Sequence, residues 1–210
     1  MKNGLLIFIG AFATLAFSWA GVVLYSHHQL SGLSQYKDPV EDTLFPQPLS
    51  GLADQGRLVY QDLGCVSCHT QQVRRDGFGA DIARKWGQRQ SVARDYIRER
   101  TVFIGSSRIG PDLRNVGART FGGADVFYNI LYSPQLIAPG MPAYEFLFEV
   151  RPTGSVQSSR KAFKITADGR EIVPTHRAEA LVAYLLSLKD TYEYPEAAPF
   201  VETAKPEGGH

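Results

Sequence analysis

The residues best placed to do chemistry are two cysteines and a histidine within five positions. Residues 65–69 read Cys-Val-Ser-Cys-His, and Cys65 and Cys68 are the two cysteines of the chain. Thiols three positions apart can each add to one vinyl group of a porphyrin, and the next residue then points its imidazole at the iron. This C-x-x-C-H spacing is typical of c-type haem attachment. We therefore predict one covalently bound haem c, with Cys65 and Cys68 as thioether links and His69 as an axial ligand of the iron.

Three other interpretations of the motif account for fewer of its residues. A redox-active C-x-x-C pair expects a strand–turn–helix setting and gives His69 no role. A structural zinc site needs four ligands, and Cys65, Cys68 and His69 supply only part of such a set. A plain disulfide between the two cysteines would close a short, strained loop.

A single histidine leaves the second axial position of a haem iron open. Met141 is the one methionine beyond the first residue. It lies between Pro139 and Pro142, which restrict the backbone, discourage helix and favour a stiff loop. We predict Met141 as the second axial ligand, with His176 as its competitor. Ligation by His and Met raises the reduction potential and leaves no position for oxygen, so the domain is expected to carry electrons.

The elements that must position this site begin with an apolar run at the N-terminus. Residues 4–25 carry no charge, and no Asp, Glu, Lys or Arg occurs between Lys2 and Lys37. As a helix the run is about 33 Å long, close to the hydrocarbon thickness of a bilayer. It is longer than the roughly 7–15-residue apolar centre of a cleaved signal peptide, so we predict a retained membrane anchor over 1–26. Lys2 favours an N-terminus in the cytoplasm, with the rest of the chain on the opposite side.

An extended linker over 27–50 is predicted to follow the anchor. Pro39, Pro46 and Pro48 stand among scattered polar residues there, a composition that favours extended chain. A folded domain is expected to begin near Gly51. The histidines outside the domain suit a buried iron poorly: they lie at the membrane exit or at the end of the chain and are His27, His28 and His210.

Two amphipathic helices and a hairpin are predicted within the domain. Apolar residues recur at helical spacing over 52–63, before Gly64, and again over 177–189. Thr175 is a candidate N-cap for the second helix. Residues 162–173 alternate around Asp-Gly, which indicates a β-hairpin inside an insertion over about 151–174.

The charge of the chain is nearly balanced but unevenly distributed. The net charge is +1, which gives no reason to expect nucleic-acid binding. Residues 70–119, however, contain eleven Lys and Arg against five Asp and Glu. Two interpretations stay open for this basic segment: a solvated face, or a surface that docks a partner or binds haem propionates.

The segment that reads Gly-Pro-Asp-Leu at 110–113 resembles the G-P-x-L loop of class I cytochromes c. The resemblance implies that the Pro111 carbonyl accepts a hydrogen bond from the His69 imidazole and so orients it. It further implies that Leu113 packs on the haem face and that Arg119 approaches a propionate. The helices at the two ends of such a domain cross each other, and Gly56 would permit close contact there.

Four segments in order are similar to the membrane-anchored mono-haem subunit (subunit II) of cbb3-type cytochrome c oxidases. They are GCVSCHTQQVR, GSSRIGPDLRNVGAR, MPAYEFLFE and EIVPTHRAEALVAYLLSL. The resemblance implies a mainly α fold: one N-terminal transmembrane helix, then a class I cytochrome c-like domain over 51–190 with a small β-hairpin insertion, and a C-terminal tail over 191–210.

The same resemblance implies a non-catalytic electron-transfer subunit of a terminal respiratory oxidase. Single electrons would pass from a donor cytochrome c through the haem to haem b of a catalytic haem-copper subunit, which reduces oxygen. The expected partners are that subunit, a second c-type cytochrome subunit or soluble donor, and membrane lipid, with no nucleic acid. The expected location is the bacterial inner membrane, single-pass, with the haem domain on the periplasmic side. The alternatives are a cytochrome subunit of nitric-oxide reductase and a free-standing anchored shuttle.

Overall fold

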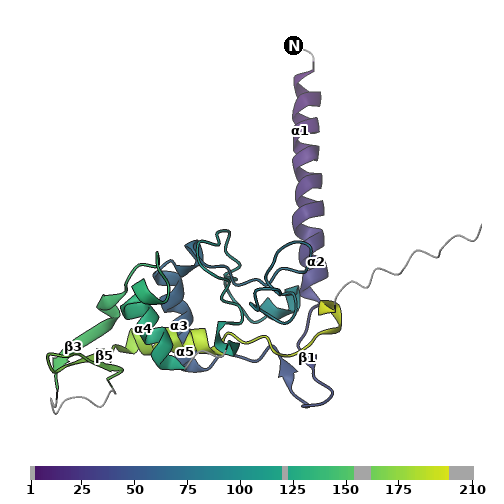
Figure 1. Cartoon of the computed structure of the whole chain (residues 1–210). Coiled ribbons are helices and arrows are strands. Elements are labelled where there is room, and N and C mark those ends of the chain that lie inside the picture. The colour runs from purple at the N-terminus through teal and green to yellow at the C-terminus, as the bar shows by residue number, and fades with distance from the viewer. Residues whose placement is uncertain (1–2, 120–122, 154–161, 199–210) are drawn as a thin grey trace, which may run out of the picture. The chain divides into compact units, whose positions relative to one another are not determined.

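The computed structural model describes residues 3–119, 123–153 and 162–198, which form helices and two small antiparallel sheets (Figure 1). The chain divides into two compact units. The first contains the described residues up to Pro46 together with Ala93–Glu99, and the second contains Gln47–Val92 and the described residues from Arg100 onwards. The predicted fold class, mainly α with one apolar N-terminal helix and a small hairpin, is confirmed.

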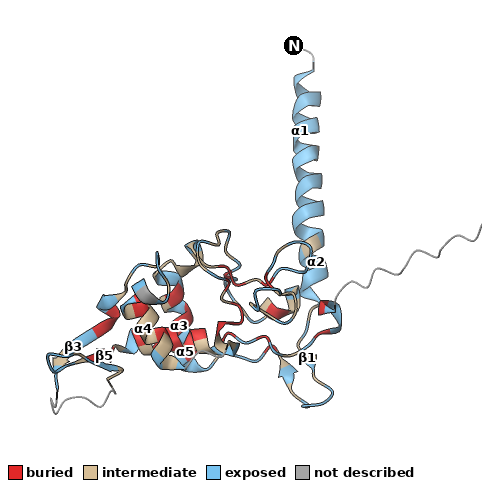
Figure 2. Ribbon diagram, in the orientation of Figure 1, coloured by how far each residue is buried: buried red, intermediate tan, exposed pale blue. Residues whose placement is uncertain are grey.

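The apolar N-terminal run forms a continuous helix over Gly4–Ser31. It consists of α1 (Gly4–Trp19), a π-helical turn (Ala20–Leu24) and α2 (Tyr25–Ser31). Its side chains are almost all exposed (Figure 2), as expected of a helix whose neighbours are lipids. Among the described residues it is the one helix long and apolar enough to cross a membrane.

The prediction of an extended linker over 27–50 is wrong in part. The N-terminal helix runs on into this segment, because no Pro or Gly occurs over residues 22–31 to end it before Gly32. Strand β1 (Tyr36–Lys37) then pairs antiparallel with β2 (Leu44–Phe45). The prolines therefore lie around a small hairpin instead of stiffening an extended chain.

Two arginines of the basic segment belong to the first unit and pack with this linker. The guanidinium of Arg94 donates to the carbonyl of Ser34, and Arg98 donates to the Gln35 side chain over 3.2 Å. Gln35 in turn donates to the carbonyl of Pro46 over 2.8 Å. Residues 93–99 lie inside the predicted domain in sequence, but they fold with the linker in space.

Both predicted amphipathic helices are present in the second unit. Helix α3 spans Gly51–Asp62, and α5 spans His176–Ser187 with Thr175 as its N-cap, as predicted; the Thr175 hydroxyl accepts a hydrogen bond from the Ala178 amide. The two helices cross where Gly56 faces Ala180: a Cβ on Gly56 would lie 1.8 Å from the Ala180 carbonyl oxygen. The close approach predicted at this glycine is confirmed.

A third helix and a three-stranded sheet complete the core of the second unit. Helix α4 spans Ala124–Tyr132, and the sheet has the order β3 (Phe148–Pro152), β5 (Arg170–Pro174), β4 (Lys164–Ile165). The hairpin β4–β5 confirms the prediction over 162–173, whereas β3 and α4 were not predicted. Short 3₁₀ turns are η2 Cys65–Ser67, η3 Ala93–Tyr96, η4 Val116–Ala118, η5 Pro134–Leu136, η6 Glu145–Leu147 and η7 Pro195–Ala197.

The interior of the second unit is apolar and partly aromatic (Figure 2, red). Tyr60 of α3 lies 5.4 Å from Phe103 and 5.5 Å from Tyr184 of α5, measured between ring centroids. Further core side chains come from α4, from the sheet and from α5: Phe127, Leu131, Phe148, Ile172, Leu181 and Leu185. The crossed helices therefore form the scaffold on which the loops between them are held.

We expect the Gly56→Ala variant to be destabilised by at least about 2 kcal/mol. The added methyl group would overlap the Ala180 backbone and approach the Tyr184 Cβ to 2.8 Å, so the helices must separate. Overpacking of this kind costs roughly 1–3 kcal/mol or more and exceeds the roughly 1 kcal/mol that alanine gains over glycine in a helix. The denaturant midpoint of the full-length chain in detergent measures the change. Gly51→Ala, in the same helix with nothing within 4 Å, is the control; equal midpoints for both variants would contradict the packing.

Candidate haem-binding site

The C-x-x-C-H motif forms a tight turn directly after α3. Gly64 has a positive φ of 69°, which favours glycine and ends the helix. The His69 amide then donates to the Cys65 carbonyl over 3.0 Å, and the Cys68 amide donates to the same carbonyl over 3.2 Å. Cys65, Cys68 and His69 are all half-buried. The three predicted haem-attachment residues are therefore held on one turn at the edge of the core.

The electrostatic setting of the cysteines differs from that of a redox-active pair. Burial raises the pKa of Cys65 to about 11, and the neighbouring Cys68 adds to the effect. Cysteines that exchange disulfides have a lowered thiol pKa, which stabilises the attacking thiolate. The shift therefore disfavours the thiol-oxidoreductase alternative.

The His69 ring is fixed by a hydrogen bond and by a glycine. Its Nδ1 lies 2.8 Å from the Pro111 carbonyl oxygen. A carbonyl only accepts, so Nδ1 carries the proton and Nε2 is left as the nitrogen that can bind a metal. The ring also lies against Gly110: a Cβ there would be 2.2 Å from Cε1 and 2.9 Å from Nε2 of His69. The imidazole thus has one orientation and one tautomer.

Asp112 ties the Gly-Pro loop to the residues that follow His69. Its carboxylate is fully buried; it accepts hydrogen bonds from the Thr70 hydroxyl over 2.6 Å and the Gln72 amide over 2.7 Å. The Leu113 amide donates to the Thr70 carbonyl, and the Gly110 amide to the Cys68 carbonyl. Asp112 was not predicted to have a role of its own. A carboxylate directly after Gly-Pro, where backbone amides are exposed by the turn, is the signal that could have found it.

Leu113 and Arg119 lie in the same loop region with different surroundings. Leu113 is half-buried and packs against the core of the second unit. The Arg119 guanidinium donates to the carbonyls of Asp112 and Trp86. Burial lowers the pKa of Arg119, and its Nε is enclosed without a hydrogen-bond partner among the described residues. A buried donor without an acceptor is unfavourable and fits an acidic group brought in from outside the chain.

Met141 sits in a tight turn, as the flanking prolines predict. Gly140 has a φ of 96°, and the Met141 amide donates to the Ala138 carbonyl over 3.1 Å. The Met141 side chain is half-buried and packs against the same core as Cys65 and Leu113.

Tyr144, three residues further on, anchors this loop to α4. Its amide donates to the Leu131 carbonyl of α4 over 2.7 Å, which anchors the loop. Burial raises the pKa of Tyr144, and the charges of Cys65 and Cys68 raise it further. Tyr144 was not predicted as a site residue, because an aromatic residue after Met-Pro-Ala carries no signal of its own.

The competing histidines lie in other surroundings. The His176 side chain is 57% exposed at the start of α5, and its Nε2 lies 2.9 Å from the Gln55 side-chain oxygen. His27 and His28 are exposed on α2 in the first unit. His210 lies outside the described residues. This arrangement favours Met141 over His176 as the partner of His69.

Two arginines of the basic segment form ion pairs with buried carboxylates. Arg108 pairs with the buried carboxylate of Asp81 and donates to the Gln72 carbonyl over 2.7 Å. Arg114 pairs with Asp190, three residues after the end of α5, and both side chains are buried. These arginines hold loops together, so the excess of positive charge in the sequence overstates the charge that reaches the surface.

The residues of the turn, the Gly-Pro loop and the Met141 loop fit a covalently bound haem. Two free thiols lie on one turn, His69 presents one defined nitrogen, and Gly110 lacks the Cβ that would overlap the imidazole of His69. In a comparison with protein families, residues 5–170 match the model described as "Cytochrome C oxidase, mono-heme subunit/FixO". No curated protein matches the chain.

Proposed function

Because the chain belongs to the family of mono-haem subunits of cytochrome c oxidase, subunit II of the cbb3 type, we propose that it relays single electrons from a donor cytochrome c to haem b of the catalytic subunit. Membership makes the chain an electron-transfer subunit of the oxidase. The donor, the acceptor and the ligand set are our proposals, and oxygen reduction is assigned to the catalytic haem-copper subunit.

Four residues would hold the haem in this proposal. Cys65 and Cys68 would form the thioether links, and His69 and Met141 would ligate the iron. The bound haem c supplies one-electron chemistry at its iron. Ligation by a thioether and an imidazole would favour the reduced state and would leave no position for oxygen, which suits an electron carrier.

The single observation that carries the proposal is the fixed orientation of His69. The Pro111 carbonyl accepts from Nδ1, and Gly110 lies against the ring. An acceptor on the outer nitrogen raises the basicity of the inner one and prevents the ring from turning. The Asp112 carboxylate stabilises this geometry by accepting hydrogen bonds from Thr70 and Gln72. Leu113 would cover the haem face, and Arg119 would meet a propionate.

The membrane arrangement follows from the apolar helix. We propose that Gly4–Ser31 crosses the bacterial inner membrane once, with the N-terminus in the cytoplasm and the haem domain on the periplasmic side. The haem domain would span 51–190, with its insertion at about 151–174 and a tail over 191–210. Tethering raises the effective concentration of the carrier at its acceptor, since neither has to find the other by diffusion.

Blue-native electrophoresis of gently solubilised membranes tests the proposal. We expect a haem-staining band that contains this chain, migrates far above its own mass and oxidises a reduced c-type cytochrome with uptake of oxygen. A haem band that migrates alone would identify a free-standing shuttle. Co-migration with nitric-oxide-reducing activity and no oxygen uptake would identify the reductase subunit instead.

A further inference from the structure

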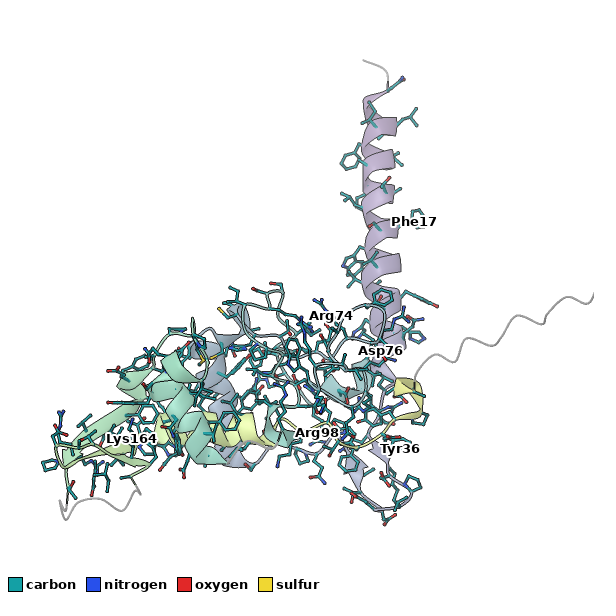
Figure 3. All side chains as sticks on the ribbon, viewed as in Figure 1. Phe17, Tyr36, Arg74, Asp76, Arg98 and Lys164 are labelled. Carbon is teal, nitrogen blue, oxygen red and sulfur yellow. The ribbon has the colours of Figure 1, made fainter. Side chains whose placement is uncertain are left out.

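A short loop of the second unit keeps its positive charge at the surface, in contrast to Arg108 and Arg114. We define the basic loop as residues 74–85. It contains four exposed cations against one exposed carboxylate, Asp76; the four are Arg74, Arg75, Arg84 and Lys85. None of the four forms an ion pair with a carboxylate among the described residues. Figure 3 labels Arg74 and Asp76 on this loop. The haem-binding site uses none of these side chains.

The basic loop is held to the rest of the second unit by hydrogen bonds and an ion pair. Asp81, its buried member, accepts a hydrogen bond from the Arg74 amide over 2.7 Å and pairs with Arg108. The Trp86 amide donates to the Asp81 carbonyl over 2.9 Å, which closes the turn. Lys85 adopts a φ of 59°, a conformation that favours Gly or Asn. A lysine at this position is unfavourable for the backbone and places its charge on the outer side of a rigid turn.

Two of the arginines are held by aromatic rings. The Arg75 guanidinium lies 4.1 Å from the ring centroid of Phe78, and that of Arg84 lies 5.0 Å from the Trp86 ring. Stacking fixes the plane of a guanidinium and leaves its N–H edges free for carboxylates, which Arg binds through two parallel hydrogen bonds. Phe78 itself is 68% exposed. Arg and aromatic residues are also the types most enriched at protein interfaces.

The same contacts connect the basic loop to the haem-binding site. Arg108, which pairs with Asp81, donates to the Gln72 carbonyl, and the Gln72 amide donates to Asp112. Asp112 belongs to the loop that orients His69. A protein docked on the basic loop would therefore be held against the side of the domain that carries the proximal histidine.

We propose that the basic loop is the docking surface for an acidic protein that exchanges electrons with this chain. The inference rests on the proposed electron-transfer function and adds the partner's charge and the place where it binds. Complementary charge steers encounter and can raise association rates by roughly 10- to 1,000-fold at low salt.

The loop suits an acidic protein better than an anionic membrane. Its one strongly exposed aromatic side chain, Phe78, has a ring face covered by Arg75, so it cannot insert freely among acyl chains. Asp76 lies among the cations and would be repelled by a uniformly negative bilayer. On a protein partner, which carries charges of both signs, a single carboxylate can find a matching cation.

The test uses the full-length, haem-loaded chain in nanodiscs and two probes. The probes are reduced c-type cytochromes of net negative and net positive charge, mixed with the oxidised chain in a stopped-flow instrument over a range of ionic strength. The variant carries Arg75→Glu and Lys85→Glu. The control carries Lys164→Glu and Lys189→Glu, an equal change in net charge at two exposed lysines; Lys164, on β4, is labelled far from Arg74 in Figure 3.

We expect the second-order rate constant with the acidic cytochrome to fall about tenfold in the Arg75/Lys85 variant at low salt. Its salt dependence should largely disappear, and the control should change less than threefold. Equal losses in variant and control, or a faster wild-type reaction with the basic probe, would overturn the proposal. So would a wild-type rate that drops to the variant's level in anionic nanodiscs, which would assign the loop to lipid.

A separate readout distinguishes failure of this inference from failure of the proposed function. Each protein is also reduced by ascorbate with a neutral mediator, which needs no docking. If ascorbate reduces every protein normally and the spectra are unchanged, but the charge substitutions do not alter the rate with the acidic cytochrome, the docking surface alone is overturned. If neither ascorbate nor a reduced cytochrome reduces the haem-loaded chain, the electron-transfer function itself is overturned.

Discussion

The Gly110→Ala variant is expected to attach much less haem than the wild type. The new Cβ would lie 2.2 Å from Cε1 and 2.6 Å from Nδ1 of His69. Carbon atoms pack at about 3.5–4.0 Å, so the imidazole must move by more than about 1 Å and abandon its hydrogen bond to the Pro111 carbonyl. Changes to groups that orient a metal-binding histidine typically cost about 10–100-fold in metal affinity. Because a thioether link does not dissociate once it has formed, the loss is expected before attachment, when the iron must be bound by His69. Haem absorbance per mole of purified chain should therefore fall about tenfold.

Two matched variants separate ring displacement from loss of fold. Pro111→Ala keeps the backbone carbonyl that faces His69, and Gly51→Ala adds the same methyl group where nothing lies within 4 Å. Both are expected to retain haem near the wild-type level. Full haem content and an unaltered spectrum in Gly110→Ala would show that the ring does not lie against this glycine in the loaded protein.

The Met141→Ala variant is expected to keep its haem and lose its high reduction potential. The thioether links and His69 remain, but the iron loses its second protein ligand. Axial ligands set haem potentials over roughly 0.8 V, and a drop of at least about 0.1 V is expected here. Spectroelectrochemistry measures the potential, and carbon monoxide should bind to the reduced variant but not to the reduced wild type.

His176→Ala is the matched control for the methionine assignment. Its ring is exposed and engaged with Gln55, so its removal should leave the potential and the spectrum unchanged. The opposite pattern, with a large shift in His176→Ala and none in Met141→Ala, would transfer the ligand role to the histidine and imply a rearrangement of α5.

Much of the scaffold was predictable because its signals are local. The apolar run, the spacing of apolar residues in α3 and α5, the Thr175 cap and the turn between β4 and β5 each depend on neighbouring residues. The Gly56 crossing was predictable from the family resemblance, and the geometry agrees with it.

The features that the sequence analysis missed depend on contacts between distant segments. Asp112 organises the loop through Thr70 and Gln72, forty or more positions away. The pairing of Arg108 with Asp81 turns an apparent surface charge into an internal one, and charge counts cannot register this. The linker was mistaken for extended chain because its packing against 93–99 is equally non-local.

The measurement that tests the account most directly is the mass of the denatured, reduced chain purified from a host with an active cytochrome c maturation system. We predict a mass equal to that of the polypeptide plus one haem. The band should still stain for haem on a denaturing gel, and neither Cys65 nor Cys68 should react with iodoacetamide. A polypeptide of unmodified mass that takes up two alkyl groups would contradict the account.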